Sequence, residues 1–307
     1  MRVCVIGATG FVGRALVPAL RRDGHAVSAW VRSEARARRV LGAGVECVPE
    51  SRGEDALGAL VGRSEAVVNL AGEPLVGRRW TAARRVALRS SRVELTERLV
   101  RAIAQSRTRP RVLVSGSAVG YYGDRAGERL PESAPPGDDF LAHLCREWEH
   151  AARAATAHGV RVMTLRSGVA LGREGGALAP MLLPFRLGVG GPVGSGRQYF
   201  PWIHLDDLVR VITVALLDER YLGPVNAVAP EQVTSREFAR ELGRAVRRPA
   251  ILPTPAFLLR VLFGESASVV LTGQRTEPRA LSQWGFAFAF PTLEAALTDI
   301  VGPRRGR

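Results

Sequence analysis

The first 25 residues carry the feature that most constrains what this chain can fold into. A short apolar run rich in β-branched residues, Arg2 to Ile6, is followed by glycines at positions 7, 10 and 13. Apolar residues then recur at roughly helical intervals up to His25, and a second apolar run occupies positions 26–31. This order predicts a strand, a tight glycine turn, a helix and the next strand of a parallel unit.

The spacing of these glycines also predicts a ligand. One glycine lets the chain reverse, one lets backbone N–H groups approach a pyrophosphate, and one lets the helix pack on the strand. The phosphate lies at the positive N-terminus of the helix. The alternative interpretation is a tight turn in a buried unit that binds nothing. We expect a dinucleotide here, bound by Gly7, Thr9, Gly10, Phe11, Val12 and Gly13.

Strand and helix patterns continue to alternate after this unit. Strand-like runs at 45–48, 66–70, 111–114 and 161–165 are separated by helical patterns, the longest of them at 81–105. Such alternation predicts a parallel sheet covered by helices on both faces, an α/β doubly wound Rossmann fold. With 307 residues, 46% of them hydrophobic, the chain is long enough for this fold and a small C-terminal substrate or lid region of helices and short strands.

The pattern divides the chain into four parts. Residues 1–166 are predicted to form the dinucleotide-binding Rossmann core. Residues 167–248 are predicted to supply the remaining core strands and helices and the loops of a substrate cleft, because apolar residues keep a helical period within this glycine- and proline-rich stretch. Residues 249–302 are expected to form a small helical extension, and 303–307 a frayed tail.

The formal net charge of +14 would ordinarily suggest a nucleic-acid partner. All 43 basic residues are arginines, however, and they are spread along the chain without a helix-turn-helix, zinc-finger or RNA-binding signature. We attribute the charge to compositional bias and expect no nucleic-acid partner.

The absence of lysine excludes Schiff-base chemistry and lysine-assisted proton transfer by this chain. A monomer or a homodimer is expected.

Cysteine usage and hydropathy predict the compartment. Cys4, Cys47 and Cys145 show neither a CxxC pair nor a Cys/His ligand spacing, so we expect free thiols, no disulfide framework and no metal site. The first strand leaves no room for a charged segment and a separate apolar signal segment, and no apolar run approaches the length of a membrane span. We expect a cytoplasmic protein without membrane association.

The end of the second strand predicts which coenzyme is bound. An acidic residue at this place binds the ribose hydroxyls of NAD, whereas an arginine suits the additional phosphate of NADP. Arg32 and Ser33 occupy the place, so NADP(H) is predicted in preference to NAD(H); the alternative is that Arg32 is a solvated loop charge. Small residues at the end of the fourth strand are also assigned to the coenzyme, namely Asn69, Leu70, Ala71 and Gly72.

Hydroxyl groups and glycines follow the fifth strand, in the stretch SGSAVGYYG at 115–123. The carboxyl end of a central strand is where substrate chemistry takes place in such folds, and Ser115 is assigned to the coenzyme there. Ser117 is the candidate for a hydrogen bond to the reacting oxygen. The alternative is a serine- and glycine-rich turn whose hydroxyls cap backbone groups.

Four stretches together resemble a known family: GATGFVG, SGSAVGYYG, WIHLDDLV, and the closing QRTEPRALSQWGFAFAFPTLEAAL. They resemble the NAD(P)-binding epimerase/dehydratase branch of the short-chain dehydrogenase/reductase superfamily, and within it an atypical, nucleoside-diphosphate-sugar epimerase-like subgroup with a C-terminal extension. The resemblance covers nearly the whole chain. It implies the Rossmann fold and a nicotinamide coenzyme.

The resemblance also implies an altered catalytic set. Members of the superfamily use a serine after the fifth strand, which Ser117 matches, and a Tyr-x-x-x-Lys pair on the next helix. Leu141 and Cys145 stand at the tyrosine and lysine positions, and Arg92, which we assign to the coenzyme, stands at the position of a further asparagine. These departures are those of the atypical subgroup, and they remove the catalytic pair.

The remaining candidates could donate a proton or bind an anion. Tyr121, Tyr122 and Cys145 are the candidate proton donors, each with a packing role as the alternative. Arginine forks match phosphate or carboxylate, and His204 could act as a general acid or cap a helix. We assign Arg166 to the coenzyme and Arg197, His204 and Arg275 to the substrate.

Two functions follow from these residues. The first is an NADP(H)-dependent oxidoreductase or epimerase that acts on a small polar substrate, either sugar-nucleotide-like or anionic. The second is a non-catalytic NADP(H)-binding sensor or scaffold, for example one linked to the cell envelope or to division, because the phosphate-binding glycines are intact while the tyrosine and lysine are missing.

Overall fold

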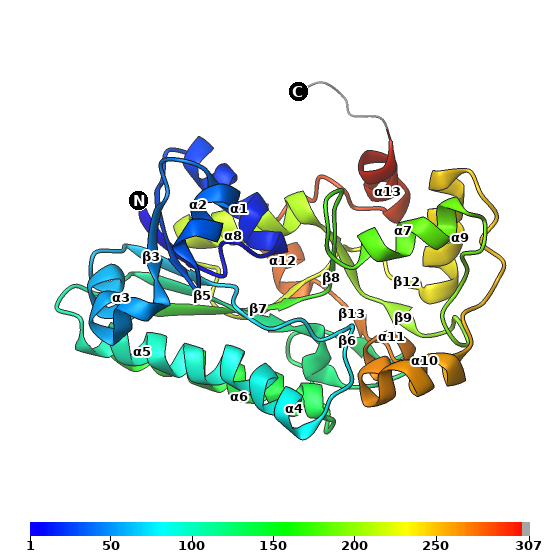
Figure 1. Cartoon of the computed structure of the whole chain (residues 1–307), viewed down its shortest axis with the longest axis horizontal. Helices are drawn as coiled ribbons and strands as arrows, with labels where there is room; N and C mark the ends of the chain where they lie inside the picture. The colour runs from blue at the N-terminus through cyan, green and yellow to red at the C-terminus, as the bar shows by residue number, and fades with distance from the viewer. Residues whose placement is uncertain (303–307) are drawn as a thin grey trace.

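A seven-stranded parallel sheet forms the core of the computed structural model, which describes residues 1–302 (Figure 1). The order across the sheet is β11-β7-β5-β4-β1-β2-β3, and every neighbouring pair is parallel. The direction of strand addition reverses between β1 and β4, as in the predicted Rossmann fold, which is thereby confirmed. In chain order the strands are β1 (Arg2–Ile6), β2 (Ala26–Val31), β3 (Glu46–Pro49), β4 (Ala66–Asn69), β5 (Val112–Ala118), β7 (Arg161–Ser167) and β11 (Gly223–Ala227).

Helices cover both faces of this sheet because each buries one apolar stripe against it. One face is covered by α1 (Phe11–Arg22), α2 (Glu34–Leu41) and α8 (Leu205–Leu217), which share a buried core with β1 and β5. The opposite face is covered by α3 (Gly53–Gly62), α5 (Leu95–Gln105) and α6 (Phe140–Arg153) (Figure 1). One helix from late in the chain, α12 (Arg279–Gln283), also packs on this sheet, since its Leu281 lies in the core of the first face.

The long helix predicted at 81–105 is present but is not uniform. It consists of α4 (Ala82–Arg89), a five-residue π-helical segment (Ser90–Glu94) and α5. A π segment shifts the helix register by one residue, and such segments are frequent at functional sites. Here the segment contains Arg92, whose guanidinium lies against Gly72 at the sheet edge.

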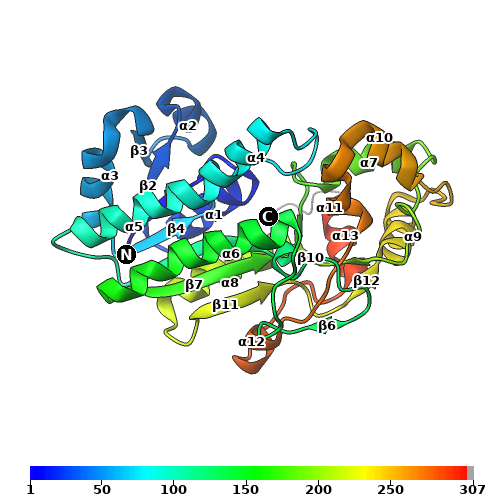
Figure 2. The same cartoon turned by 90° about the horizontal axis from the view of Figure 1, so that it is seen from below.

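A second lobe lies beyond the carboxyl ends of the strands (Figure 2). Its strands form three two-stranded sheets, β8 with β10, β9 with β12 and β6 with β13. The sequence also predicts a single short strand at 199–203, but these residues are divided between two of these sheets on either side of Pro201, which has no N–H group to continue a ladder. The strands are β6 (Arg129–Leu130), β8 (Val169–Leu171), β9 (Tyr199–Phe200), β10 (Trp202–His204), β12 (Val233–Thr234) and β13 (Arg275–Thr276).

Three helices of the second lobe enclose a separate apolar cluster that includes Trp202, Phe238 and Leu297. They are α7 (Leu178–Arg186), α9 (Ser235–Val246) and α13 (Leu293–Val301). The predicted extension, residues 249–302, contains α13, three further α-helices and β13. The predicted frayed tail lies outside the described residues. Within residues 1–302, no helix combines the length and the hydropathy needed to cross a membrane. The three further helices of the extension are α10 (Ala256–Phe263), α11 (Ser268–Leu271) and α12 (Arg279–Gln283), the last of which packs on the parallel sheet.

The glycine turn should tolerate no side chain at its third glycine. A Cβ at Gly13 would lie 2.4 Å from the carbonyl oxygen of Gly7, so Gly13→Ala must displace backbone and should lower the free energy of unfolding by about 1–3 kcal/mol. The matched control is Gly58→Ala in α3, where a Cβ meets nothing within 4 Å and should stabilise the helix by roughly 0.5–1 kcal/mol. Urea denaturation measures both, and equal effects would contradict the close packing.

Candidate functional site

The glycine turn between β1 and α1 is built by contact of backbone on backbone. Gly7 has a φ of +82°, and a Cβ on it would lie 2.7 Å from the carbonyl carbon of Leu70. The N-cap of α1 is Gly10, which offers no side-chain cap, and the first turn of α1 holds no acidic residue. The N–H groups and the positive end of the helix dipole are therefore available to an anion, and this cradle fits a pyrophosphate.

The residues after β4 lie against this turn. Asn69 is buried; its Nδ2 donates to Oγ1 of Thr96 at 2.9 Å, and its Oδ1 accepts from the backbone of Ala71. Arg92 donates from Nη2 to the carbonyl of Glu73 at 2.9 Å, and burial lowers the pKa of its guanidinium. These contacts fix the path of the chain beside the glycines, where the residues predicted to contact the coenzyme lie.

Arg32 lies at the end of β2, as predicted, but it has a partner that the sequence did not reveal. Its Nη1 is 2.9 Å from Oε1 of Glu73, and its side chain is 81% exposed. Ser33 is the N-cap of α2 and accepts from the backbone N–H of Arg36. An acidic residue is therefore present at this edge of the sheet, although it follows β4 rather than β2.

A buried ion pair is hydrogen-bonded to Ser117. Arg166 on β7 binds the carboxylate of Glu149 on α6 with two hydrogen bonds, from Nε at 2.7 Å and from Nη2 at 2.9 Å. Ser117 on β5 is 2.7 Å from Oε1 of the same carboxylate. All three residues are buried. The structure thus brings Ser117 and Arg166 together through Glu149, a residue that sequence reasoning missed.

The ion pair decides the direction of the serine hydrogen bond. A carboxylate held bidentately by a guanidinium is ionised and can only accept hydrogen bonds. The Ser117 hydroxyl is therefore the donor to Glu149, and its remaining capacity toward a ligand is that of an acceptor. A signal for Glu149 exists in the sequence, since it lies four residues after Cys145 and so on the same face of α6.

Both candidate tyrosines belong to the same polar cluster. The Tyr122 hydroxyl donates to Oδ1 of Asn226 at 2.7 Å and accepts from Nη1 of Arg166 at 3.0 Å. Burial raises the pKa of Tyr122 to about 12. The ring of Tyr121 lies under the Arg166 guanidinium, whose central carbon is 3.4 Å from the ring centroid. Asn226 on β11 is a further member that sequence reasoning missed.

The Cys145 thiol is also buried, beside Ser117 and the backbone of Ala118. Burial raises the pKa of Cys145 to about 12, so the thiol stays protonated near neutral pH and is not a nucleophile. Its place on the buried face of α6 is that of a small packing residue.

The three residues predicted to bind substrate lie apart from one another. Arg275 on β13 donates from Nε to Oε1 of Gln232 at 2.8 Å, whereas Arg197 is exposed on the loop before β9. His204 is the N-cap of α8: its Nδ1 accepts from the backbone of Asp206. Within the described residues, no hydrogen bond or ion pair joins these three to each other.

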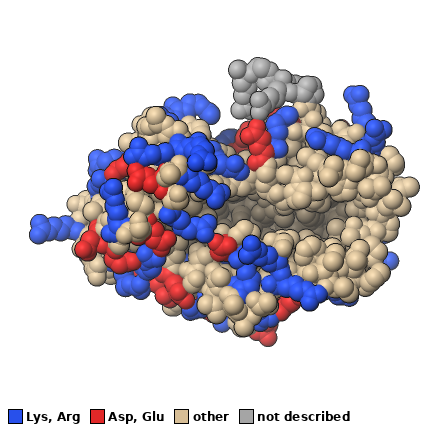
Figure 3. All heavy atoms as spheres, viewed as in Figure 1, with Lys and Arg blue, Asp and Glu red and all other residues tan. Residues whose placement is uncertain are grey.

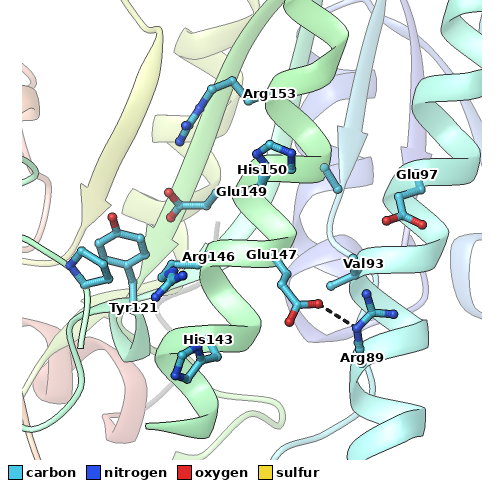
Figure 4. Close-up of a pocket in the computed structure, with 12 residues that line it drawn as sticks. Arg89, Val93, Glu97, Tyr121, His143, Arg146, Glu147, Glu149, His150 and Arg153 are labelled. Atoms are coloured by element: carbon cyan, nitrogen blue, oxygen red, sulfur yellow. Dashed lines mark hydrogen bonds and ion pairs between the residues drawn. The ribbon is translucent and has the colours of Figure 1, made fainter. Parts of the chain in front are cut away.

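The described surface is hollowed between the two lobes and along α6. The first of these hollows lies between the two lobes, with uncharged residues covering much of its floor in the view of Figure 3. The second is a cavity of about 630 Å³ along α6, lined by Tyr121 and Glu149 among others; the ion pair of Arg89 and Glu147 lies on its opposite side (Figure 4). Among the described residues, no cluster of His, Cys, Asp or Glu could hold a metal ion.

A parallel sheet in Rossmann order, with a glycine turn at the N-terminus of its first helix, defines a dinucleotide-binding protein. The family model described as NAD dependent epimerase/dehydratase family matches residues 3–226, and one described as a domain of unknown function, DUF1731, matches residues 254–300. The chain belongs to the NAD-dependent epimerase/dehydratase family, as its motifs predicted, and is an NAD(P)-binding member of it.

Curated relatives match nearly the whole chain. The epimerase family protein SDR39U1 homolog, chloroplastic, of Arabidopsis thaliana is 43% identical over 98% of this chain and 87% of its own length. The epimerase family protein SDR39U1 of Bos taurus is 42% identical over 98% of this chain and 100% of its own length.

Solved structures agree with this assignment. The crystal structure of human epimerase family protein SDR39U1 (isoform 2) with NADPH has a TM-score of 0.88 and 40% identity, covering 98% of this chain and 99% of that one. A nucleoside-diphosphate sugar epimerase from Corynebacterium glutamicum has a TM-score of 0.77 and 34% identity, covering 98% of this chain and 58% of that one.

The buried ion pair should behave as a coupled unit. Removing one partner leaves the other charge buried and unpaired, so Glu149→Gln and Arg166→Met should each lower the free energy of unfolding by about 3–5 kcal/mol. The double variant should lose clearly less than the sum of the two losses. Chemical denaturation of the four proteins measures the coupling, and strictly additive losses would contradict it.

His204 should make stability depend on pH. Burial lowers its pKa in the folded protein, and as a cap it accepts a hydrogen bond that only the neutral ring can accept. Below the unfolded value of about 6.5 the unfolded chain binds a proton that the folded chain resists, so stability falls as the pH drops through this window. His204→Asn keeps an acceptor and should flatten the dependence of the melting temperature on pH; His150→Asn, at an exposed site, should not.

Proposed function

We propose that this protein is an NADP(H)-dependent oxidoreductase or epimerase that acts on a small polar substrate, sugar-nucleotide-like or anionic, through a hydroxyl group. The observation that carries the proposal is the oriented hydroxyl of Ser117 at the carboxyl end of β5, on the sheet edge that faces the second lobe. An acceptor at this place suits a substrate that presents an O–H group.

The chain's own residues fit the coenzyme. The turn of Gly7, Gly10 and Gly13 would hold the diphosphate, and Arg32 and Ser33 would hold the 2′-phosphate. When bound, the nicotinamide would accept or donate the hydride at the substrate carbon. Support for the phosphorylated form comes from the human relative, whose structure was determined with NADPH.

Glu149 acts on Ser117 as a positioning residue. Its carboxylate fixes the direction of the hydroxyl, and Arg166 fixes the carboxylate. Both oxygens of this carboxylate already accept hydrogen bonds from Arg166, so Glu149 is placed to orient the hydroxyl rather than to remove its proton. Arg166 and Glu149 thus hold the Ser117 hydroxyl in one direction, and such positioning contributes to catalysis when it keeps the reacting atoms close together.

A non-catalytic sensor or scaffold is the second candidate. It is favoured by the state of two predicted proton donors: the Tyr122 hydroxyl is buried and bound on both sides, and the Cys145 thiol is buried with a raised pKa. Neither group can exchange a proton with a ligand in the arrangement described. A protein that binds the coenzyme without catalysing a reaction needs the phosphate-binding glycine turn but needs no available proton donor.

Two readouts with a panel of sugar nucleotides and small hydroxy compounds separate the two candidates: reduction of NADP⁺, and detection of epimerised product by NMR, because an epimerase returns its coenzyme unchanged. An enzyme should exceed the background rate in one of these readouts with some members of the panel, and Ser117→Ala should lower that rate about 10–100-fold because the hydrogen bond from the substrate hydroxyl is lost. The dissociation constant of NADPH should not change. Thr213→Val, in α8, is the matched control for loss of one hydroxyl. Equal background rates with every compound and with both variants would favour the sensor.

A further inference from the structure

We propose that Glu73 is a determinant of coenzyme choice that opposes the 2′-phosphate: its carboxylate holds Arg32 as the phosphate would, and remains beside the phosphate site as a fixed negative charge. The inference rests on the coenzyme assignment proposed above. It extends that assignment because it places an opposing charge in the same site, in the loop after β4, where the sequence analysis assigned no charged residue to the coenzyme.

The position of the ion pair identifies the site. Arg32 follows β2 and Glu73 comes shortly after β4, and these two strands flank β1 in the sheet. The pair, with its 2.9 Å contact, therefore spans the carboxyl end of β1, where the glycine turn begins at Gly7. Leu70, three residues before Glu73, lies against that glycine. The ion pair is thus at the edge of the pyrophosphate cradle.

The two partners are held very differently. Glu73 binds Arg84 on α4 through its second oxygen, at 3.1 Å, and the Arg84 side chain is only 14% exposed. Both backbone groups of Glu73 are also hydrogen-bonded: the carbonyl accepts from Arg92, and the N–H donates to Oγ of Ser91. Among the described residues, the Arg32 side chain is hydrogen-bonded to Glu73 alone. Glu73 is therefore the firmly held member of the pair, and Arg32 is the exposed one.

The charge of Glu73 persists when Arg32 leaves. Arg84, and to a lesser degree Arg32, lowers the pKa of the Glu73 carboxyl, so the group is ionised at neutral pH. An exposed ion pair contributes little to stability, and a phosphate can therefore draw Arg32 away from it. A phosphate monoester with about −1.5 to −2 charges then faces a carboxylate that cannot follow Arg32.

The ribose of NAD(H) meets a different environment. Its 2′-hydroxyl is neutral and can donate a hydrogen bond to a carboxylate, the role that an acidic residue plays after the second strand in NAD-binding relatives of this fold. Glu73 therefore favours NADH and disfavours NADPH, while Arg32 does the reverse. Together, Arg32 and Glu73 give a moderate preference for NADPH over NADH instead of an absolute one.

Fluorescence titration of the full chain with NADPH and with NADH tests the proposal. Glu73→Gln should tighten NADPH about 5–10-fold and leave NADH unchanged or weaker, because one unit of negative charge is removed near the phosphate. Arg32→Gln should weaken NADPH at least about 10-fold. In the double variant, the gain from Glu73→Gln should remain, since the fixed carboxylate repels the phosphate whether or not Arg32 is present.

A matched control variant shows whether the change in coenzyme affinity is specific to Glu73. Glu46→Gln removes one member of another exposed arginine-glutamate pair, that with Arg63, and should change neither affinity. Thermal unfolding confirms that the variants fold, and Glu73→Ser provides a second removal of the carboxylate. If Glu73→Gln and Glu73→Ser leave NADPH binding unchanged or weaken it, the role of Glu73 is overturned. If the unmodified protein binds neither coenzyme, the proposed function fails, and this inference fails with it.

Discussion

Contact of backbone on backbone at the glycine turn is the constraint on which the rest of the molecule depends. Gly7 lies against Leu70 and Gly13 against Gly7, so β1, α1 and the chain after β4 meet without side chains between them. This packing leaves the N-terminus of α1 uncapped at the point where strand addition reverses. Arg32, Glu73 and Ser117 lie at or just after the carboxyl ends of β2, β4 and β5. The packing at the glycine turn sets where these strand ends lie, and so it sets the positions of the three side chains.

Most of the fold could be predicted because its signals are local. β-branched runs, glycine turns and helical periods indicated the order of strands and helices, and the family motifs indicated the topology. Two features could not be predicted. The π segment at 90–94 adds one residue within a continuous apolar stripe, which a periodic pattern does not register. The division of the 199–203 run depends on pairing with β8 and β12, strands distant in sequence.

The position of a candidate site residue was predictable only where it depends on the end of one strand. Ser117, Arg32 and the glycines lie at such positions, and their roles stay predictions. Their partners Glu149 and Glu73 are brought to them by tertiary contacts across 32 and 41 positions. The four-residue spacing from Cys145 places Glu149 on the right face of α6, but no spacing rule indicates that either glutamate contacts its partner. The same limit applies to Tyr122, whose hydroxyl is bound by side chains from β7 and β11. Residue identity indicated the chemistry, whereas the fold decided which hydroxyls are available.

The electrostatics around Ser117 differ from those of a Tyr-x-x-x-Lys site. In that arrangement a nearby ammonium lowers the pKa of a phenol and prepares it to exchange a proton. Here the positive charge is that of Arg166, and Glu149 neutralises it with two hydrogen bonds. Burial then dominates at Tyr122, and its pKa rises to about 12 in spite of the adjacent guanidinium. The Tyr122 phenol is therefore not prepared for proton exchange as in such a site, and the function proposed for this sheet edge rests instead on the Ser117 hydroxyl, whose direction is set by Glu149.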